Sequence, residues 1–310
     1  IKIADLIGCA GSVLIILFAS AWIPLMGPLF RILTPLPFLY YATKLGLNQG
    51  IIVSLITLFI VGIIAKLAGF SHFISLSLEF CLIGLVISMI FRRQFTFGRT
   101  VFWGTVILMI ISAAVMFVLS LSRGLMPIDM VQNYFQANIG ENFLVYEDLG
   151  LEKEKVAQLR QLGKMLSDII AKIYPALVII GTGFIVWINV VISKPLFNLK
   201  GLKYPEYEKL DRWQAPDLMV WGVIFMGFAL FIKVSAIRLI AINALIVMAV
   251  IYVYNGLAIV LFLFNKYNVP RWARFGIYAL IIIQQMSLAI LSLMGLFDQW
   301  IDFRRIHKKV

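Results

Sequence analysis

Long, nearly uninterrupted apolar runs are the feature that most constrains this sequence. The first extends from Ile7 to Met26, and about 20 consecutive apolar residues are enough for a helix to cross a bilayer. Of the 310 residues, 62% are hydrophobic and only 14% are charged, whereas soluble domains average about 45–50% and roughly 25%. One compact soluble core cannot hide this much apolar surface, so a soluble enzyme is excluded.

Eight apolar runs have the length of membrane-spanning helices, and a broken apolar segment follows the first. The broken segment, Leu29–Tyr41, contains Arg31, Pro35 and Pro37, so we expect a short or re-entrant helix that other parts of the protein cover. The sequence thus predicts an all-α, multi-pass membrane protein with about eight transmembrane helices plus this segment. The spans are expected at Ile7–Met26, Gly50–Ala68, Phe73–Phe91, Val101–Leu121, Tyr174–Ile192, Leu218–Ile232, Leu239–Phe264 and Phe275–Phe297.

A polar stretch at residues 122–172 separates two groups of membrane helices, at 1–121 and 173–310. After Gly150, apolar residues recur every three or four positions, which is typical of an amphipathic helix; it runs into the next span and is expected to kink near Pro175. Such a helix could lie on the headgroups, receive a partner or, most simply, cap its own bundle. The apolar positions are Val156, Leu159, Leu162, Leu166, Ile169, Ile170 and Ile173.

Loop charges predict the orientation, because basic residues accumulate in cytoplasmic loops. The loop Arg92–Arg99 has three arginines and no acid, so we expect it on the cytoplasmic side. Residues 122–172 carry seven acidic and six basic residues, which favours the outside, and the basic segment Lys194–Ala215 returns inside. The net charge of +12 therefore fits cytoplasmic loops that contact anionic headgroups.

The C-terminal third leaves the orientation open. Lys266, Arg271 and Arg274 mark another cytoplasmic loop, and one further span would place the basic tail on the opposite side. Either the span Leu239–Phe264 is split near Asn255 and Gly256, or the tail breaks the charge rule. The tail's basic residues are Arg304, Arg305, Lys308 and Lys309.

Polar side chains inside the spans are candidate ligand-binding residues, since a charge within a membrane is costly and an intramembrane ionisable group is often functional. Glu79 is the acid that lies well inside an apolar run, and five amides lie in other spans. These groups could line one cavity with Glu79, or they could hold helices together by hydrogen bonds. The amides are Asn189, Asn243, Asn255 and the adjacent pair Gln284 and Gln285, of which at most one can face a given cavity.

Motifs for enzyme chemistry are missing from the sequence. The two histidines, His72 and His307, are far apart, so no metal cluster is expected. The chain has no glycine-rich phosphate loop and no nucleophile or protease motif, and its basic residues are scattered rather than grouped with aromatic ones. We expect no catalytic residue, no cofactor and no nucleic-acid partner. The expected partners are membrane lipids and another protein in the membrane.

Three short motifs carry a resemblance that covers nearly the whole chain. They are Leu33–Phe38 after the first span, Arg212–Pro216 before a late span, and Gly295–Asp298 with Asp302–Arg304 near the end. With these motifs the chain resembles the uncharacterised bacterial YybS-like membrane proteins. That family is distantly similar to the substrate-binding S components of energy-coupling-factor transporters.

The resemblance implies a bundle that binds a small molecule and depends on a separate energising partner. Two departures are visible: S components are shorter, and their paired alanines four residues apart are absent, because Ile23 follows four residues after Ala19. Two main hypotheses therefore remain. The chain is a small-molecule-binding or transport subunit, or it is a scaffold or anchor subunit of a larger membrane complex.

Overall fold

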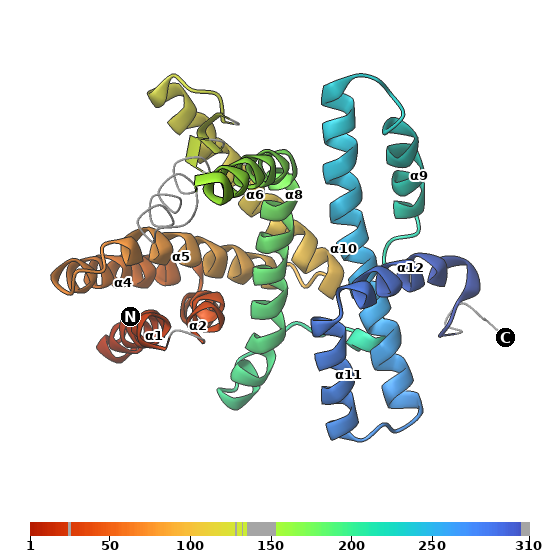
Figure 1. Ribbon diagram of the computed structural model, residues 1–310. Helices are drawn as coiled ribbons and strands as arrows, with labels where there is room; N and C mark the ends of the chain where they lie inside the picture. Colours follow the sequence, from red (N-terminus) through yellow and green to blue (C-terminus); the bar gives the residue numbers. More distant parts are fainter. Residues whose placement is uncertain (24–25, 128, 132, 135–152, 305–310) are drawn as a thin grey trace. The chain divides into compact units, whose positions relative to one another are not determined.

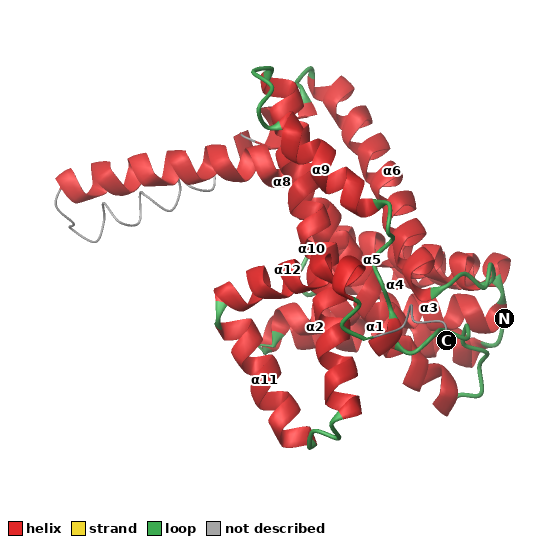
Figure 2. Ribbon diagram, turned by 90° about the vertical axis from the view of Figure 1, so that its right-hand side faces the viewer, coloured by secondary structure: helices red, strands yellow, loops and turns green. Residues whose placement is uncertain are grey.

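The computed structural model describes residues 1–23, 26–127, 129–131, 133–134 and 153–304, and in these residues every regular element is a helix (Figures 1 and 2). The all-α class is therefore confirmed. The helices of the first half are α1 (Ile3–Trp22), α2 (Gly27–Leu33), α3 (Pro35–Leu45), α4 (Leu47–Leu67), α5 (His72–Phe91) and α6 (Phe97–Arg123). Those of the second half are α8 (Lys153–Leu199), the 3-10 turn η1 (Leu210–Arg212), α9 (Met219–Ala229), α10 (Ser235–Lys266), α11 (Arg271–Ile283) and α12 (Gln285–Ile301).

Six of the described helices are long and apolar enough to cross a membrane, and a seventh crossing is possible if the bent pair α11–α12 counts as one span. The expected count of about eight is thus an approximation. The span expected at Leu218–Ile232 is the 11-residue helix α9, which at 1.5 Å per residue is about 16 Å long and falls short of the roughly 30 Å hydrocarbon core.

The single span expected at Phe275–Phe297 is instead two helices bent by 103°. The break lies at Gln284, whose extended backbone (φ −90°, ψ 99°) ends α11 and precedes α12. By contrast, α10 runs without interruption through Asn255 and Gly256. The break therefore lies in the last predicted span, and the alternative that split Leu239–Phe264 near Asn255 and Gly256 is wrong.

Contacts group the chain into two compact units. Unit 1 contains residues 1–112 and 181–207, and unit 2 contains residues 113–180 and 208–310. Part of the polar stretch, residues 135–152, lies outside the described residues, and the expected boundaries at 121 and 172 stay a prediction. The predicted continuation into the next span is confirmed, because residues 153–199 form the continuous helix α8; its apolar residues Leu162, Leu166 and Ile169 are exposed.

The core of unit 1 is built almost entirely from apolar side chains of α1, α3, α4 and α5. Helix α3 lies close to α5 because Gly84 has no side chain: a Cβ there would lie 2.7 Å from the Cβ of Phe38 and 2.7 Å from the carbonyl oxygen of Pro35. Gly50 allows a similar approach of α4 to Ala42. The fully buried core residues include Cys9, Val13, Leu17, Phe38, Val53, Val61, Ala65 and Phe73.

The broken segment expected at Leu29–Tyr41 is confirmed as two short helices, α2 and α3, which meet at Thr34. A helix end leaves its last carbonyl groups without partners inside the helix. Asn189 of α8 donates to one of them, the carbonyl oxygen of Ile32, at 2.8 Å. The Asn189 amide thereby provides a hydrogen-bond partner for a carbonyl group that the break between α2 and α3 leaves free.

Unit 2 is organised around the contact of α10 with α12 (Figure 1). Glycines bring the two backbones together: a Cβ at Gly256 would overlap the carbonyl oxygen of Leu291, and a Cβ at Gly295 would overlap that of Tyr252. Asn255 then donates to the carbonyl oxygen of Gly295 at 2.8 Å.

A buried ion pair fixes the end of α12. The guanidinium of Arg304 contacts the carboxylate of Asp298 at 2.6 Å, and both side chains are at most 2% exposed. Arg304 also donates to the Asn255 amide oxygen at 3.0 Å and to the carbonyl oxygens of Asp211 and Trp213. The left-handed backbone of Asp302 (φ 45°) turns the chain back after α12.

These contacts place Arg304 beside the segment before α9. Asp211 of that segment accepts a hydrogen bond from Asn265, which lies next to the last residue of α10, Lys266. The side of the membrane on which the basic tail lies stays a prediction.

Helix α8 is opened locally at Pro175, where a kink was expected. Asn243 of α10 accepts a hydrogen bond from the backbone N–H of Ala176 at 2.9 Å and donates to the carbonyl oxygen of Lys172 at 2.8 Å. In a regular helix these two backbone groups would bond to each other. The amide is thus inserted into the hydrogen-bond ladder, which is one of the known causes of helix bending.

Candidate functional site

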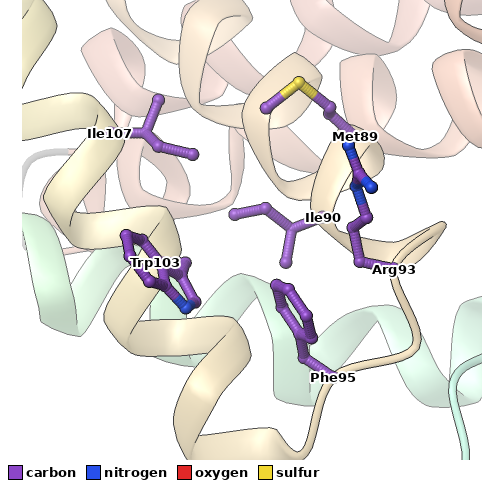
Figure 3. Close-up of a pocket in the computed structure, with 6 residues that line it drawn as sticks. All are labelled: Met89, Ile90, Arg93, Phe95, Trp103 and Ile107. Atoms are coloured by element: carbon purple, nitrogen blue, oxygen red, sulfur yellow. The ribbon is translucent and has the colours of Figure 1, made fainter.

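A shallow, half-open groove lies between α5 and α6 in unit 1 (Figure 3). Its volume is about 290 Å³, near the lower end of the roughly 300–1,000 Å³ typical of small-molecule sites. Met89 and Arg93 form one wall, Trp103 and Ile107 the opposite wall, and Ile90 and Phe95 lie between them. The groove is therefore apolar apart from one guanidinium group.

The loop that carries Arg93 is anchored at both ends by aromatic side chains. Phe91 and Phe97 flank the loop, and both rings pack edge-on against Tyr207, with centroids 6.5 Å and 5.5 Å away. The Tyr207 hydroxyl donates to the Thr100 hydroxyl at 3.1 Å. Burial raises the pKa of Tyr207 to about 12, so its hydroxyl stays neutral and remains a donor at physiological pH.

The loop also ends α5 in a defined way. Gln94 has a left-handed backbone (φ 51°), and its side-chain amide donates to the carbonyl oxygen of Phe91 at 2.9 Å. This contact satisfies one of the carbonyl groups that a helix end leaves free. Arg93 is thus attached to a constrained turn.

The charge of this loop is not neutralised by described carboxylates. Arg92, Arg93 and Arg99 are all exposed, and none has an ion-pair partner among the residues that the structure describes. Lys44 of α3 differs, because its ammonium group contacts the Asp5 carboxylate at 2.6 Å. The sequence identified these arginines as a sign of orientation but gave no indication of the groove beside them.

Glu79 lies on the exposed surface of α5. It is seven residues after the first residue of the helix, His72, or about 10 Å along the helix axis. Leu78, the preceding residue, is 52% exposed, and Ser75, one helix turn before Glu79, is exposed as well. No described residue forms a hydrogen bond or ion pair with the Glu79 carboxylate. Glu79 thus faces away from the core of unit 1.

Three of the predicted amides are engaged with helix backbones. Asn189 in unit 1 bonds to Ile32, and Asn243 and Asn255 in unit 2 bridge α10 to α8 and to α12. Gln284 is exposed at the bend between α11 and α12. Glu79 shares unit 1 with Asn189, whereas the other three belong to unit 2, and the common cavity stays a prediction.

The two late motifs meet in unit 2. Arg304 donates to the carbonyl oxygen of Trp213, and Gln299 donates to that of Pro216, at 3.3 Å. Arg304 pairs with Asp298 because α12 ends at Ile301 and the following turn brings Arg304 back to it; Arg305 lies outside the described residues.

The chain has several long apolar helices, which approach one another closely at glycines and are joined by hydrogen bonds from buried amides. These features define a multi-pass α-helical membrane protein. In the described residues, no three histidine, cysteine, aspartate or glutamate side chains are grouped so that they could hold a metal ion. The family follows from the sequence comparison: the chain belongs to the family of predicted membrane proteins DUF2232, whose model matches residues 12–299.

A curated relative supports this assignment. The chain is 24% identical over 307 residues to the uncharacterized protein YybS of Bacillus subtilis strain 168, and the match covers 95% of this chain and 96% of that protein. The resemblance to YybS-like proteins is thereby confirmed, whereas similarity to S components stays a prediction. No solved structure matches the chain.

Proposed function

We propose that this protein is a non-catalytic subunit of the bacterial plasma membrane that binds a transmembrane helix of a partner protein along α5. The observation that supports the proposal is the exposed carboxylate of Glu79 inside a span. Ionisable groups within spans almost always face protein or a water-filled cavity, because exposure to lipid costs a few kcal/mol. A partner helix would provide the protein environment that the described residues do not provide.

The partner's chemistry follows from charge complementarity. A lysine, arginine or histidine side chain opposite Glu79 would stabilise the carboxylate in a medium of low dielectric constant. A second copy of the same face would bring two carboxylates together, and like charges at close range disfavour ionisation of both. The proposal therefore specifies a different protein with a basic residue in its transmembrane helix, flanked by apolar residues that cover Leu78.

Site-specific photo-crosslinking in cells tests the proposal. A crosslinking residue at Leu78 of α5 is expected to capture one membrane protein, and the same residue at Phe59 of α4, which is 69% exposed, serves as the matched control. Glu79→Lys should lower capture at least tenfold, because a pair of attracting charges becomes a repelling pair. Replacing the partner's basic residue with glutamate should then restore capture.

Two outcomes would refute the proposal. Capture at Leu78 that is equal to capture at Phe59 would show that α5 has no preferred partner. Capture that Glu79→Lys leaves unchanged would show that the carboxylate is not part of the contact.

The alternative, a small-molecule-binding or transport subunit with a separate energising partner, predicts a different effect of Glu79→Gln. Loss of a co-purifying small molecule in this variant would support a cavity at Glu79 and contradict the partner helix. The partner-helix proposal is better supported, since Asn189, Asn243 and Asn255 already bond to helix backbones.

A further inference from the structure

We propose that the groove between α5 and α6 binds one anionic phospholipid, with an acyl chain against the apolar walls and the phosphate at Arg93. The groove belongs to unit 1 alone. The inference does not depend on a partner helix at Glu79, because Glu79, Ile74 and Leu78 do not line the groove.

The apolar part of the groove fits a hydrocarbon chain. Five of its six lining residues are apolar, and Met89 and Trp103 are 38% and 44% exposed. Both belong to helices that are long and apolar enough to cross a bilayer, so the surface that they expose faces lipid tails. A tryptophan at this position also suits the boundary between the tails and the headgroups.

The charged part of the groove fits a phosphate group. Arg93 lies beside Met89 on one wall (Figure 3), and its guanidinium can form two parallel hydrogen bonds to phosphate oxygens. Arg92 and Arg99 add positive charge to the same loop, which contains no acid. If this loop is cytoplasmic, as its charge predicts, it faces the leaflet in which anionic lipids attract basic residues.

The groove is formed before a ligand arrives. Phe91 and Phe97 hold the two ends of the loop on Tyr207, and Gln94 caps α5. A constrained site pays little ordering cost on binding. Arg93 therefore requires only a side-chain adjustment to reach a headgroup.

The combination of both parts identifies a lipid rather than free phosphate as the occupant. Free phosphate would contact Arg93 but would leave the walls formed by Ile90, Phe95 and Ile107 without a partner. A phosphate that is attached to an acyl chain uses both parts. The competition arm of the experiment below separates these two sources.

Native mass spectrometry of the full chain, with phosphatidylglycerol and phosphatidylcholine as probes, tests the inference. One phosphatidylglycerol is expected to remain bound under conditions that remove phosphatidylcholine. Arg93→Gln should lower phosphatidylglycerol affinity about fivefold, the effect of one basic residue at a membrane surface. Arg99→Gln makes the same change of charge outside the groove and should have a much smaller effect.

Two further variants and a competitor complete the test. Ile107→Trp should reduce binding because it fills the apolar part, and Arg93→Lys should retain part of the selectivity because it keeps the charge. Inorganic phosphate at millimolar concentration should not displace the lipid. The helix content of each variant, measured by circular dichroism, verifies that it is folded.

The inference would be overturned by any of three results. Equal losses for Arg93→Gln and Arg99→Gln would indicate attraction by the loop charge alone. Equal retention of the two lipids would remove the role of the phosphate. Complete displacement by inorganic phosphate would show that the apolar walls contribute nothing.

Discussion

The two units differ in the kinds of side chain that they bury between their helices. In unit 1 the residues with no exposed surface are mostly apolar, such as Val13, Leu17, Phe38 and Phe73. Unit 2 has few such residues and instead buries the ion pair of Arg304 and Asp298 with Asn255. Lipid tails are as apolar as leucine, so apolar burial alone gives helices little preference for one neighbour. Close backbone approach at glycines occurs in both units, and unit 2 adds the directional contacts of a buried ion pair.

The largest effect is expected from removing one member of the buried ion pair. Arg304→Leu leaves Asp298 charged and without its partner, which typically costs about 3–5 kcal/mol. Hydrogen exchange should increase in α12 and in the α10 segment around Asn255, while α3 and α5 stay protected. Most of the loss should be recovered in the double variant Arg304→Leu/Asp298→Leu; equal destabilisation of both variants would mean that the ion pair is not the cause.

An intermediate effect is expected from adding a side-chain atom where α3 and α5 lie closest together in unit 1. Gly84→Ala places a Cβ against Phe38 and Pro35, and overpacking of this kind costs about 1–3 kcal/mol. Thermal unfolding in detergent should shift to lower temperature, with faster hydrogen exchange in α3 and α5. Gly62→Ala in α4 is the matched control, since no atom lies within 4 Å of its Cβ position; a similar shift in both variants would contradict the assignment.

The smallest effect is expected from the amide in the opened ladder of α8. Asn243→Leu removes the two hydrogen bonds to α8 and one to the Leu239 carbonyl oxygen, but the Ala176 N–H and the Lys172 carbonyl can then bond to each other. The cost should therefore be close to the average of about 0.6 kcal/mol for polar contacts between membrane helices. Exchange of the Ala176 amide should change little; destabilisation of about 3 kcal/mol or more would show that the opening has another role.

The sequence predicted the helices better than it predicted their breaks. Length and hydropathy identified α1, α4, α5, α6, α8 and α10, because one run of apolar residues is sufficient evidence for a span. They could not identify the bend at Gln284, since two adjacent glutamines in an apolar run are compatible with a straight helix. The prolines at 35 and 37 gave a stronger signal, and the broken segment Leu29–Tyr41, in which the break at Thr34 lies, was predicted from them.

The candidate site was less accessible to sequence reasoning. Glu79 stands out in any hydropathy profile, but which way it faces depends on how α5 packs against α3 and α4. The groove at Arg93 depends on residues from two helices and the loop between them, and nothing in their spacing shows that they enclose a space. The ion pair of Asp298 and Arg304 was also hidden, because it requires the left-handed turn at Asp302.

The bend between α11 and α12 changes how reporter experiments on this protein should be interpreted. A profile that counts residues 275–297 as one crossing would assign a fusion placed after Phe303 to the compartment opposite that of Lys209. The contacts of Arg304 with Asp211 and Trp213 predict instead that both positions report the same compartment. In this chain, a count of apolar segments and the contacts of one arginine therefore make opposite predictions, which the two fusions distinguish.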